Sequence, residues 1–128
     1  MKFFLISLGG ILGANARFLL GSLVSERLKQ PSFPWGTFLI NVSGSLILGL
    51  FMELSRLQKW DDSWRLLIAV GFLGAYTTFS TFEYESMRLI LDGQWQIALR
   101  YLLGSVATGL LGVWLGIFLA RLLGQAPR

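Results

Sequence analysis

The stretch Gly71-Phe-Leu-Gly-Ala-Tyr-Thr-Thr-Phe-Ser-Thr-Phe82 lies midway along an otherwise apolar segment of the chain. Its twelve positions hold two glycines, three phenylalanines and four Ser or Thr residues, a mixture that weakens an α-helix. Inside a bilayer each backbone N–H or C=O that loses its partner costs several kcal/mol, so such residues are tolerated where the loosened backbone finds new partners, often around a cavity or an ion. The stretch therefore predicts a functional interruption of a membrane-spanning helix between Gly74 and Thr78.

The composition assigns the whole chain to the membrane. Hydrophobic residues make up 54% of the 128 and charged residues 14%, whereas roughly a quarter of residues are charged in soluble domains. A membrane-spanning helix needs about 20 mostly apolar residues. We therefore predict an all-α membrane protein with one domain, 1–128, and four transmembrane helices, the third interrupted near its middle. The predicted spans are roughly 3–25, 36–57, 65–91 and 97–122.

Two residue types that the chain lacks disfavour several function classes. It has no cysteine and no histidine, so thiolate chemistry, the usual titrating group near neutral pH and the commonest metal ligand are missing. We therefore expect that the chain is not an enzyme. The net charge of +4 comes from basic residues that stand singly near span ends, where anionic lipid headgroups explain them, so no nucleic-acid partner is expected.

The distribution of Lys and Arg bears on topology and assembly. With four spans both termini lie on one side, which holds six Lys and Arg residues against four on the other when Arg17 is left out. This is a weak orientation signal. It fits one orientation with cytoplasmic termini, or insertion both ways, which would let two copies pair as an antiparallel dual-topology homodimer. Charge counting does not choose between them, but four helices are too few to enclose an aqueous path and still pack a core, so an oligomer is favoured.

Small and polar residues recur at helical spacing within the spans. Gly9 and Gly13, like Gly112 and Gly116, are four residues apart and predict faces where helices approach closely. The second and fourth spans each carry a polar stripe: Thr37, Asn41 and Ser45, and Tyr101, Ser105 and Thr108. These neutral donors suit an anion that sheds water. The alternative is hydrogen bonding between helices, about 0.6 kcal/mol each, which we favour for Ser45 and Thr108 alone.

Charged residues within the spans are few. Arg17 is deep in the first span, where a charge costs at least about 2.5–3.5 kcal/mol, so it should face a wet vestibule or a partner. Glu85 and Arg88 follow the predicted interruption at an i, i+3 spacing that permits an ion pair.

An open helix at Gly74–Thr78 would present carbonyl oxygens on one side and unpaired N–H groups on the other. Carbonyl oxygens suit an alkali cation. Phe79 and Phe82 are i, i+3 neighbours, so they share a face, and their electropositive ring edges could border an anion. Taken as isolated residues, they are more simply explained as lipid-facing or core aromatics.

Three motifs together carry a family resemblance. Gly13-Ala-Asn-Ala-Arg17-Phe, Gly36-Thr-Phe-Leu-Ile-Asn41-Val-Ser-Gly44 and the segment from Gly71 to Phe82 occur in the order and spacing that resemble the small bacterial fluoride channels, the Fluc family, also called CrcB. The resemblance implies a fluoride-selective ion channel that lets fluoride leave the cytoplasm passively and so reduces fluoride toxicity. It also implies an antiparallel dual-topology homodimer with two pores in the bacterial cytoplasmic (inner) membrane, with no other protein partner.

The resemblance also implies roles for individual residues. The backbone carbonyls of Gly74 and Thr77 from both subunits would hold one structural Na⁺ at the dimer centre. The fluoride pathway would include Phe79, Phe82, Asn41, Thr37, Tyr101, Ser105 and Glu85. A further hydroxyl expected one turn beyond Ser105 is Gly109 here, so the track ends early or uses Thr108. Ala75 stands where family members often have glycine, which makes the predicted break slightly stiffer.

A proton-coupled small multidrug transporter is the main alternative, since it too has four spans and can insert in both orientations. Its chemistry needs a carboxylate embedded in the membrane to exchange protons with a cationic substrate. The first span here has Arg17 and no acidic residue within its apolar part. A purely structural bundle is a third possibility, and it predicts no ion flux.

Overall fold

The computed structural model describes residues 1–28 and 32–124, and nearly all of them are helical. Four helical segments are long and apolar enough to cross a membrane: α1 (Lys2–Leu28), α2 (Trp35–Gln58), the third span (Asp62–Leu91) and α6 (Trp95–Gly124). The predicted all-α architecture with four spans is thus confirmed. Each helix begins and ends within three residues of its predicted bound, because long apolar runs leave little freedom in where a span can lie.

The third span consists of several pieces: α3 (Asp62–Trp64), η1 (Arg65–Leu73), α4 (Gly74–Tyr76) and α5 (Phe79–Leu91). Asp61 begins it by accepting a hydrogen bond from the backbone N–H of Ser63 at 2.9 Å. η1 is a π-helix, which the sequence did not predict, since its apolar residues would fit an α-helix equally well. π-Helical turns are rare and are found frequently at functional sites. Here the π-helix is followed by the short piece α4 and then by Thr77 and Thr78, where the span is not helical.

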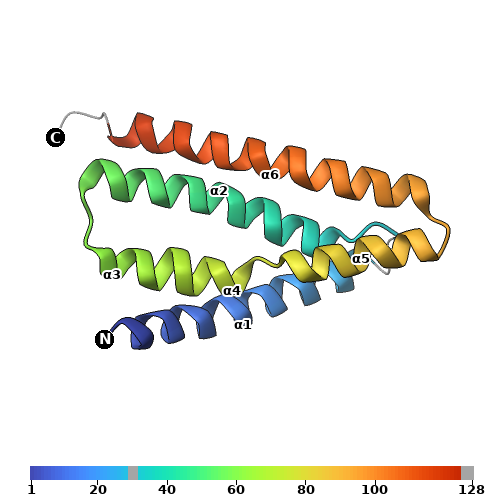
Figure 1. Ribbon diagram of the computed structural model, residues 1–128, viewed down its shortest axis with the longest axis horizontal. Coiled ribbons are helices and arrows are strands. Elements are labelled where there is room, and N and C mark those ends of the chain that lie inside the picture. The colour runs from blue at the N-terminus through green and yellow to red at the C-terminus, as the bar shows by residue number, and fades with distance from the viewer. Residues whose placement is uncertain (29–31, 125–128) are drawn as a thin grey trace.

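The two halves of the third span have different neighbours. α2 packs along α6, while α1 packs along η1 and α4 (Figure 1). After Tyr76 the chain leaves α1, and α5 packs mainly on α6. α1 begins and α6 ends at the same end of the bundle, as an even number of spans requires (Figure 1). The break thus lies where the third span changes partners.

The predicted close-approach faces are confirmed at two contacts. A Cβ atom on Gly13 would overlap the backbone carbonyl of Phe72 in η1, and a Cβ atom on Gly116 would overlap the carbonyl of Leu46 in α2. Without side chains at these positions the two backbones touch directly, which replaces the hydrophobic driving force that is absent between helices in lipid. The first contact fixes α1 against the π-helical half of the third span.

Candidate functional site: a cleft at the break in the third span

Two residues between α4 and α5 have extended backbone. Thr77 has φ −81° and ψ 158°, and Thr78 has φ −148° and ψ 119°. The side chain of Asn41 in α2 binds the backbone of Thr78 twice: its Nδ2 donates to the Thr78 carbonyl at 3.0 Å, and its Oδ1 accepts from the Thr78 N–H at 2.8 Å. One amide side chain thus supplies both partners that this residue would have lost with the helix.

Thr78 also begins the next helix. Its hydroxyl oxygen accepts a hydrogen bond from the backbone N–H of Thr81 at 3.3 Å, and the two hydroxyl groups lie 3.0 Å apart. A Thr in this position is a regular N-cap, and the N-terminus of α5 behind it carries the positive end of a helix dipole. A residue of the third span itself, Thr78, therefore caps the helix with which the span resumes.

Gly74 and Thr77 each lose the amide donor that an unbroken helix would provide. In an α-helix the N–H of Thr78 would bond to the Gly74 carbonyl, and the N–H of Thr81 to the Thr77 carbonyl. Here those two N–H groups bond to the side chains of Asn41 and Thr78 instead. The break thus releases these two carbonyl oxygens from the helical hydrogen-bond pattern.

Residues of α2 hold the chain on the approach to the break. The Tyr76 hydroxyl lies 2.8 Å from the Ser43 hydroxyl, which is 3.1 Å from the Ile40 carbonyl; when Ser43 donates to that carbonyl, Tyr76 donates to Ser43. A Cβ atom on Gly44 would overlap the Thr77 methyl group, so glycine is what lets Thr77 come this close. With Asn41, one face of α2 contacts each residue from 76 to 78.

A cleft of about 340 Å³ opens beside the break. Its lining includes Asn41, Thr77, Thr78, Phe79, Phe82 and Ser105. The hydroxyl oxygen of Ser105 is buried and has no hydrogen-bond partner among residues 1–28 and 32–124. A buried hydroxyl without a partner costs about 1–3 kcal/mol. Ser105 thus lines the cleft and carries a buried hydroxyl that no protein group within the described part of the chain satisfies.

The two phenylalanines both line the cleft but differ in environment. Phe82 is 7% exposed and packs against the ring of Tyr101 edge-on, with centroids 5.0 Å apart at 67°. Phe79 is 71% exposed, and its ring centroid lies 6.0 Å from that of Phe82. The i, i+3 spacing correctly predicts that they are neighbours. It could not show that one is locked in the core while the other stands at the surface.

A second cavity, of about 690 Å³, adjoins the cleft, because Thr78 lines both. Its lining includes Arg17, Phe33, Thr37, Thr81 and Glu85. Both oxygens of the Glu85 carboxylate accept hydrogen bonds, one from the Thr37 hydroxyl at 2.9 Å and one from the Tyr101 hydroxyl at 2.7 Å. These three residues come from α2, α5 and α6, so the carboxylate joins three helices beside the cavity that holds Arg17.

The suggested ion pair between Glu85 and Arg88 is wrong. Arg88 lies 3.7 Å from Asp92 instead, an i, i+4 pair near the end of α5. Glu85 is already bonded to two hydroxyl groups from other helices, and those partners could not be read from the spacing along α5. The polar stripe on α6 also divides: Tyr101 bonds to Glu85, Ser105 faces the cleft, and the Thr108 hydroxyl donates to the Gly104 carbonyl at 2.6 Å.

Gly109, where a hydroxyl was expected, lies at the contact between α2 and α6. A Cβ atom there would be 3.6 Å from the Ser45 hydroxyl oxygen. No group of three or more His, Cys, Asp or Glu side chains that could hold a metal ion occurs in the part of the chain that the structure describes.

Comparison with known proteins places this arrangement in a family. The family model described as "CrcB-like protein, Camphor Resistance (CrcB)" matches residues 4–117. A protein of Acidobacterium capsulatum named "Fluoride-specific ion channel FluC" is 48% identical over 118 residues, which cover 91% of this chain and 94% of that protein. A Solibacter usitatus protein of the same name is 48% identical over 94% of this chain and 99% of its own length. "Fluoride-specific ion channel FluC 2" of Clostridium acetobutylicum is 41% identical over 95% of this chain and all of its own.

These matches confirm the resemblance that the three motifs indicated. The relatives are named as ion channels and not as enzymes, in agreement with the expected absence of enzyme chemistry. Because the family model covers most of the chain and the relatives align over nearly their full length, this chain belongs to the CrcB family.

Proposed function

We propose that the protein is a fluoride-selective channel that lets fluoride leave the bacterial cytoplasm passively and thereby reduces fluoride toxicity. Relatives that share 48% of their residues with this chain carry the name of such a channel. The structural observation that carries the proposal is Ser105, which lines the cleft with Phe79 and Phe82 and whose buried hydroxyl has no partner within residues 1–28 and 32–124. An anion that passed through the cleft would satisfy it.

The chemistry of the cleft suits a small, strongly hydrated anion. Its donors are neutral: the Ser105 hydroxyl, and the second N–H of the Asn41 amide, since only one of the two bonds to the Thr78 carbonyl. The edges of the Phe79 and Phe82 rings add partial positive charge without a competing acceptor. Such groups replace water around the ion but bind it weakly enough for release, while the width of the passage excludes larger anions.

The larger cavity would serve as the vestibule of this route. Arg17 would supply a guanidinium to the anion there, while the Glu85 carboxylate in the same lining offsets its positive charge. Thr37, Tyr101 and Glu85 would act there as a unit, because the carboxylate holds both hydroxyl groups in place. Fluoride would then pass Thr78, which lines both cavities, and reach the cleft.

Two copies would form the working channel, as an antiparallel dual-topology homodimer with two pores in the cytoplasmic membrane. The weak six-to-four charge bias supports insertion in both orientations. Phe79, 71% exposed beside an open cleft, supports a second copy that covers this face. The carbonyls of Gly74 and Thr77, released from the helical pattern, would hold one Na⁺ with their counterparts, since hard oxygen ligands suit this ion.

Reconstitution into liposomes loaded with fluoride tests the proposal. A fluoride electrode should register rapid efflux when a potassium ionophore allows counter-charge to move, and the efflux should persist when the pH gradient is abolished. A proton-coupled multidrug transporter would instead exchange protons for an organic cation and release no fluoride. Vesicles that keep their fluoride while retaining folded protein would refute the proposed function.

A further inference from the structure

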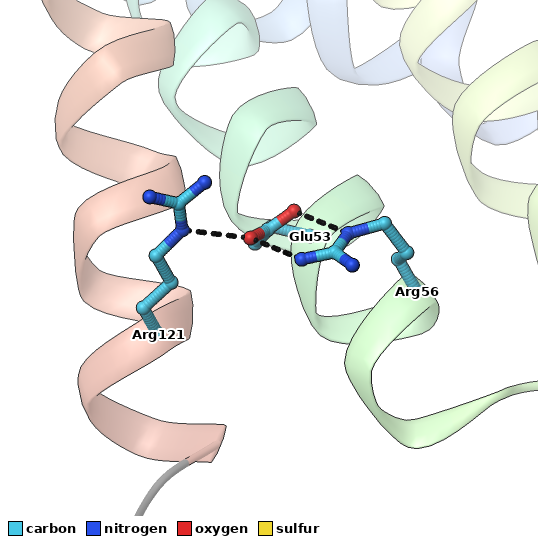
Figure 2. A network of polar contacts seen from close by, with 3 residues as sticks. All are labelled: Glu53, Arg56 and Arg121. Atoms are coloured by element: carbon cyan, nitrogen blue, oxygen red, sulfur yellow. Dashed lines mark hydrogen bonds and ion pairs between the residues drawn. The ribbon is translucent and has the colours of Figure 1, made fainter.

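Two arginines share one carboxylate at the end of the bundle where α2 and α6 both end. Figure 2 shows Glu53 of α2 between Arg56 of the same helix and Arg121 of α6. Arg56 donates from Nε to Oε2 at 2.9 Å and from Nη2 to Oε1 at 2.8 Å, and Arg121 donates from Nε to Oε1 at 2.8 Å. The Glu53 side chain is only 10% exposed, whereas those of Arg56 and Arg121 are 65% and 60% exposed.

The cluster keeps one positive charge and most of its donors. One carboxylate faces two guanidinium groups, and neither arginine forms a salt bridge with another acidic residue of the described chain. Each guanidinium has five N–H bonds. The carboxylate accepts three of the ten, so seven N–H bonds of the two guanidinium groups are not used by Glu53. The site is therefore incomplete in both charge and hydrogen bonding.

Glu53 also fixes the two guanidinium groups in space. An isolated surface arginine samples many rotamers and loses side-chain entropy when it binds. Here the bidentate bond to Arg56 and the bond across to Arg121 have already ordered both side chains. Two planar groups from different helices, held by one acceptor, form a preorganised receptor for a tetrahedral oxyanion.

The position of the cluster along the helices indicates the membrane surface. Glu53 and Arg56 lie in the last two turns of α2, and Arg121 is three residues before the end of α6. Trp60 and Trp64, 39% and 51% exposed, follow directly in the chain, and such aromatic side chains mark the headgroup level. At this depth the anions available in quantity are lipid phosphates.

We propose that Arg56 and Arg121 bind the phosphate of an anionic phospholipid, with Glu53 as the positioning residue. A single phosphodiester of charge −1 neutralises the cluster and accepts hydrogen bonds from the free N–H groups of the two arginines. A zwitterionic phospholipid offers the same phosphate but brings its own cation, so it competes poorly. The site lies at the ends of α2 and α6, and none of its three residues lines the cleft or the larger cavity.

Native mass spectrometry of the purified full-length protein in detergent tests this assignment by titration with phosphatidylglycerol or phosphatidylcholine. The wild type should bind phosphatidylglycerol at least about fivefold more tightly, the effect of roughly one arginine at an anionic headgroup. Arg121→Gln should abolish the preference. Arg100→Gln, which removes an exposed arginine from the opposite end of the same helix, should leave it unchanged within twofold. Arg121→Lys keeps the charge but cannot bond to carboxylate and phosphate together in the same geometry, so it should bind phosphatidylglycerol more weakly than the wild type.

Four outcomes would overturn the proposal. Equal affinity for the two lipids in the wild type would show that the cluster does not select an anionic headgroup. An equal loss in Arg100→Gln and Arg121→Gln would show general attraction by basic residues. Displacement of phosphatidylglycerol by inorganic phosphate at equal concentration would assign the site to a free anion. If Arg121→Gln does not fold, wild-type binding by Arg121→Lys would by itself contradict the assignment.

Discussion

Replacing Ser105 with alanine should make the protein more stable and the channel slower. The buried hydroxyl of Ser105 has no hydrogen-bond partner in the part of the chain that the structure describes, and the residue lines the cleft together with Phe79 and Phe82. If a serine has only a structural role, its replacement by alanine lowers the stability of the protein, because the hydrogen bond of its hydroxyl is lost. If Ser105 serves a passing anion, its replacement should raise the stability and slow the channel.

The expected magnitudes follow from the cost of an unsatisfied donor. Removing a buried hydroxyl without a partner relieves about 1–3 kcal/mol, so Ser105→Ala should unfold at an equal or higher temperature in detergent. Hydrogen bonds to charged groups contribute about 1.5–3 kcal/mol. If Ser105 supplies one to fluoride at the highest barrier, its loss should slow fluoride efflux from liposomes about tenfold to a hundredfold.

Thr108→Val provides the matched control on the same helix. The Thr108 hydroxyl donates to the Gly104 carbonyl at 2.6 Å and is satisfied within α6. Its replacement should cost about 0.5–1.5 kcal/mol of stability and leave fluoride efflux unchanged. Wild-type efflux from Ser105→Ala, or a loss of stability in Ser105→Ala larger than that in Thr108→Val, would refute the reasoning.

Three further predictions concern the break. Asn41→Leu should lower the unfolding temperature in detergent and abolish efflux, because it leaves the N–H and carbonyl of Thr78 without their partners. Each of these groups that water does not reach costs about 1–3 kcal/mol. Unchanged stability would contradict the role of the Asn41 amide in holding Thr78. Phe79→Ile and Phe82→Ile should each lower fluoride flux, while cross-linking should still detect the dimer. Wild-type flux from both variants would show that the two rings do not border the fluoride pathway. Exchanging Na⁺ for a large organic cation by long dialysis should reduce fluoride efflux, and restoring Na⁺ should recover it. An efflux rate that is unchanged by the exchange would argue against the cation proposed at Gly74 and Thr77.

The helices could be predicted well because their signal is local. A run of apolar residues long enough to cross the bilayer must be a helix there, since no other single segment satisfies its own backbone. Gly13 and Gly116 were likewise identifiable from spacing along one helix, and their contacts with the neighbouring backbones agree. The π-helical form of Arg65–Leu73 had no such signal, because its residues would suit an α-helix equally well.

The contacts of the site depend on how each helix is rotated against the others, which one sequence does not reveal. Spacing indicated that Asn41 is a polar residue on one face of α2, but not that both polar atoms of its amide bind the backbone of Thr78. It suggested Arg88 as the partner of Glu85, whereas Thr37 and Tyr101 reach that carboxylate from other helices. Glu53 near the end of α2 gave no sign of its bond to Arg121, 68 residues away.

The reversal potential of a planar bilayer, with fluoride concentrated on one side and chloride on the other, tests fluoride-selective conduction most directly. The current through the wild-type protein should reverse close to the equilibrium potential of fluoride and far from that of chloride. A reversal potential near that of chloride, or the absence of any current from protein shown to be folded and inserted, would contradict a fluoride channel built around this break.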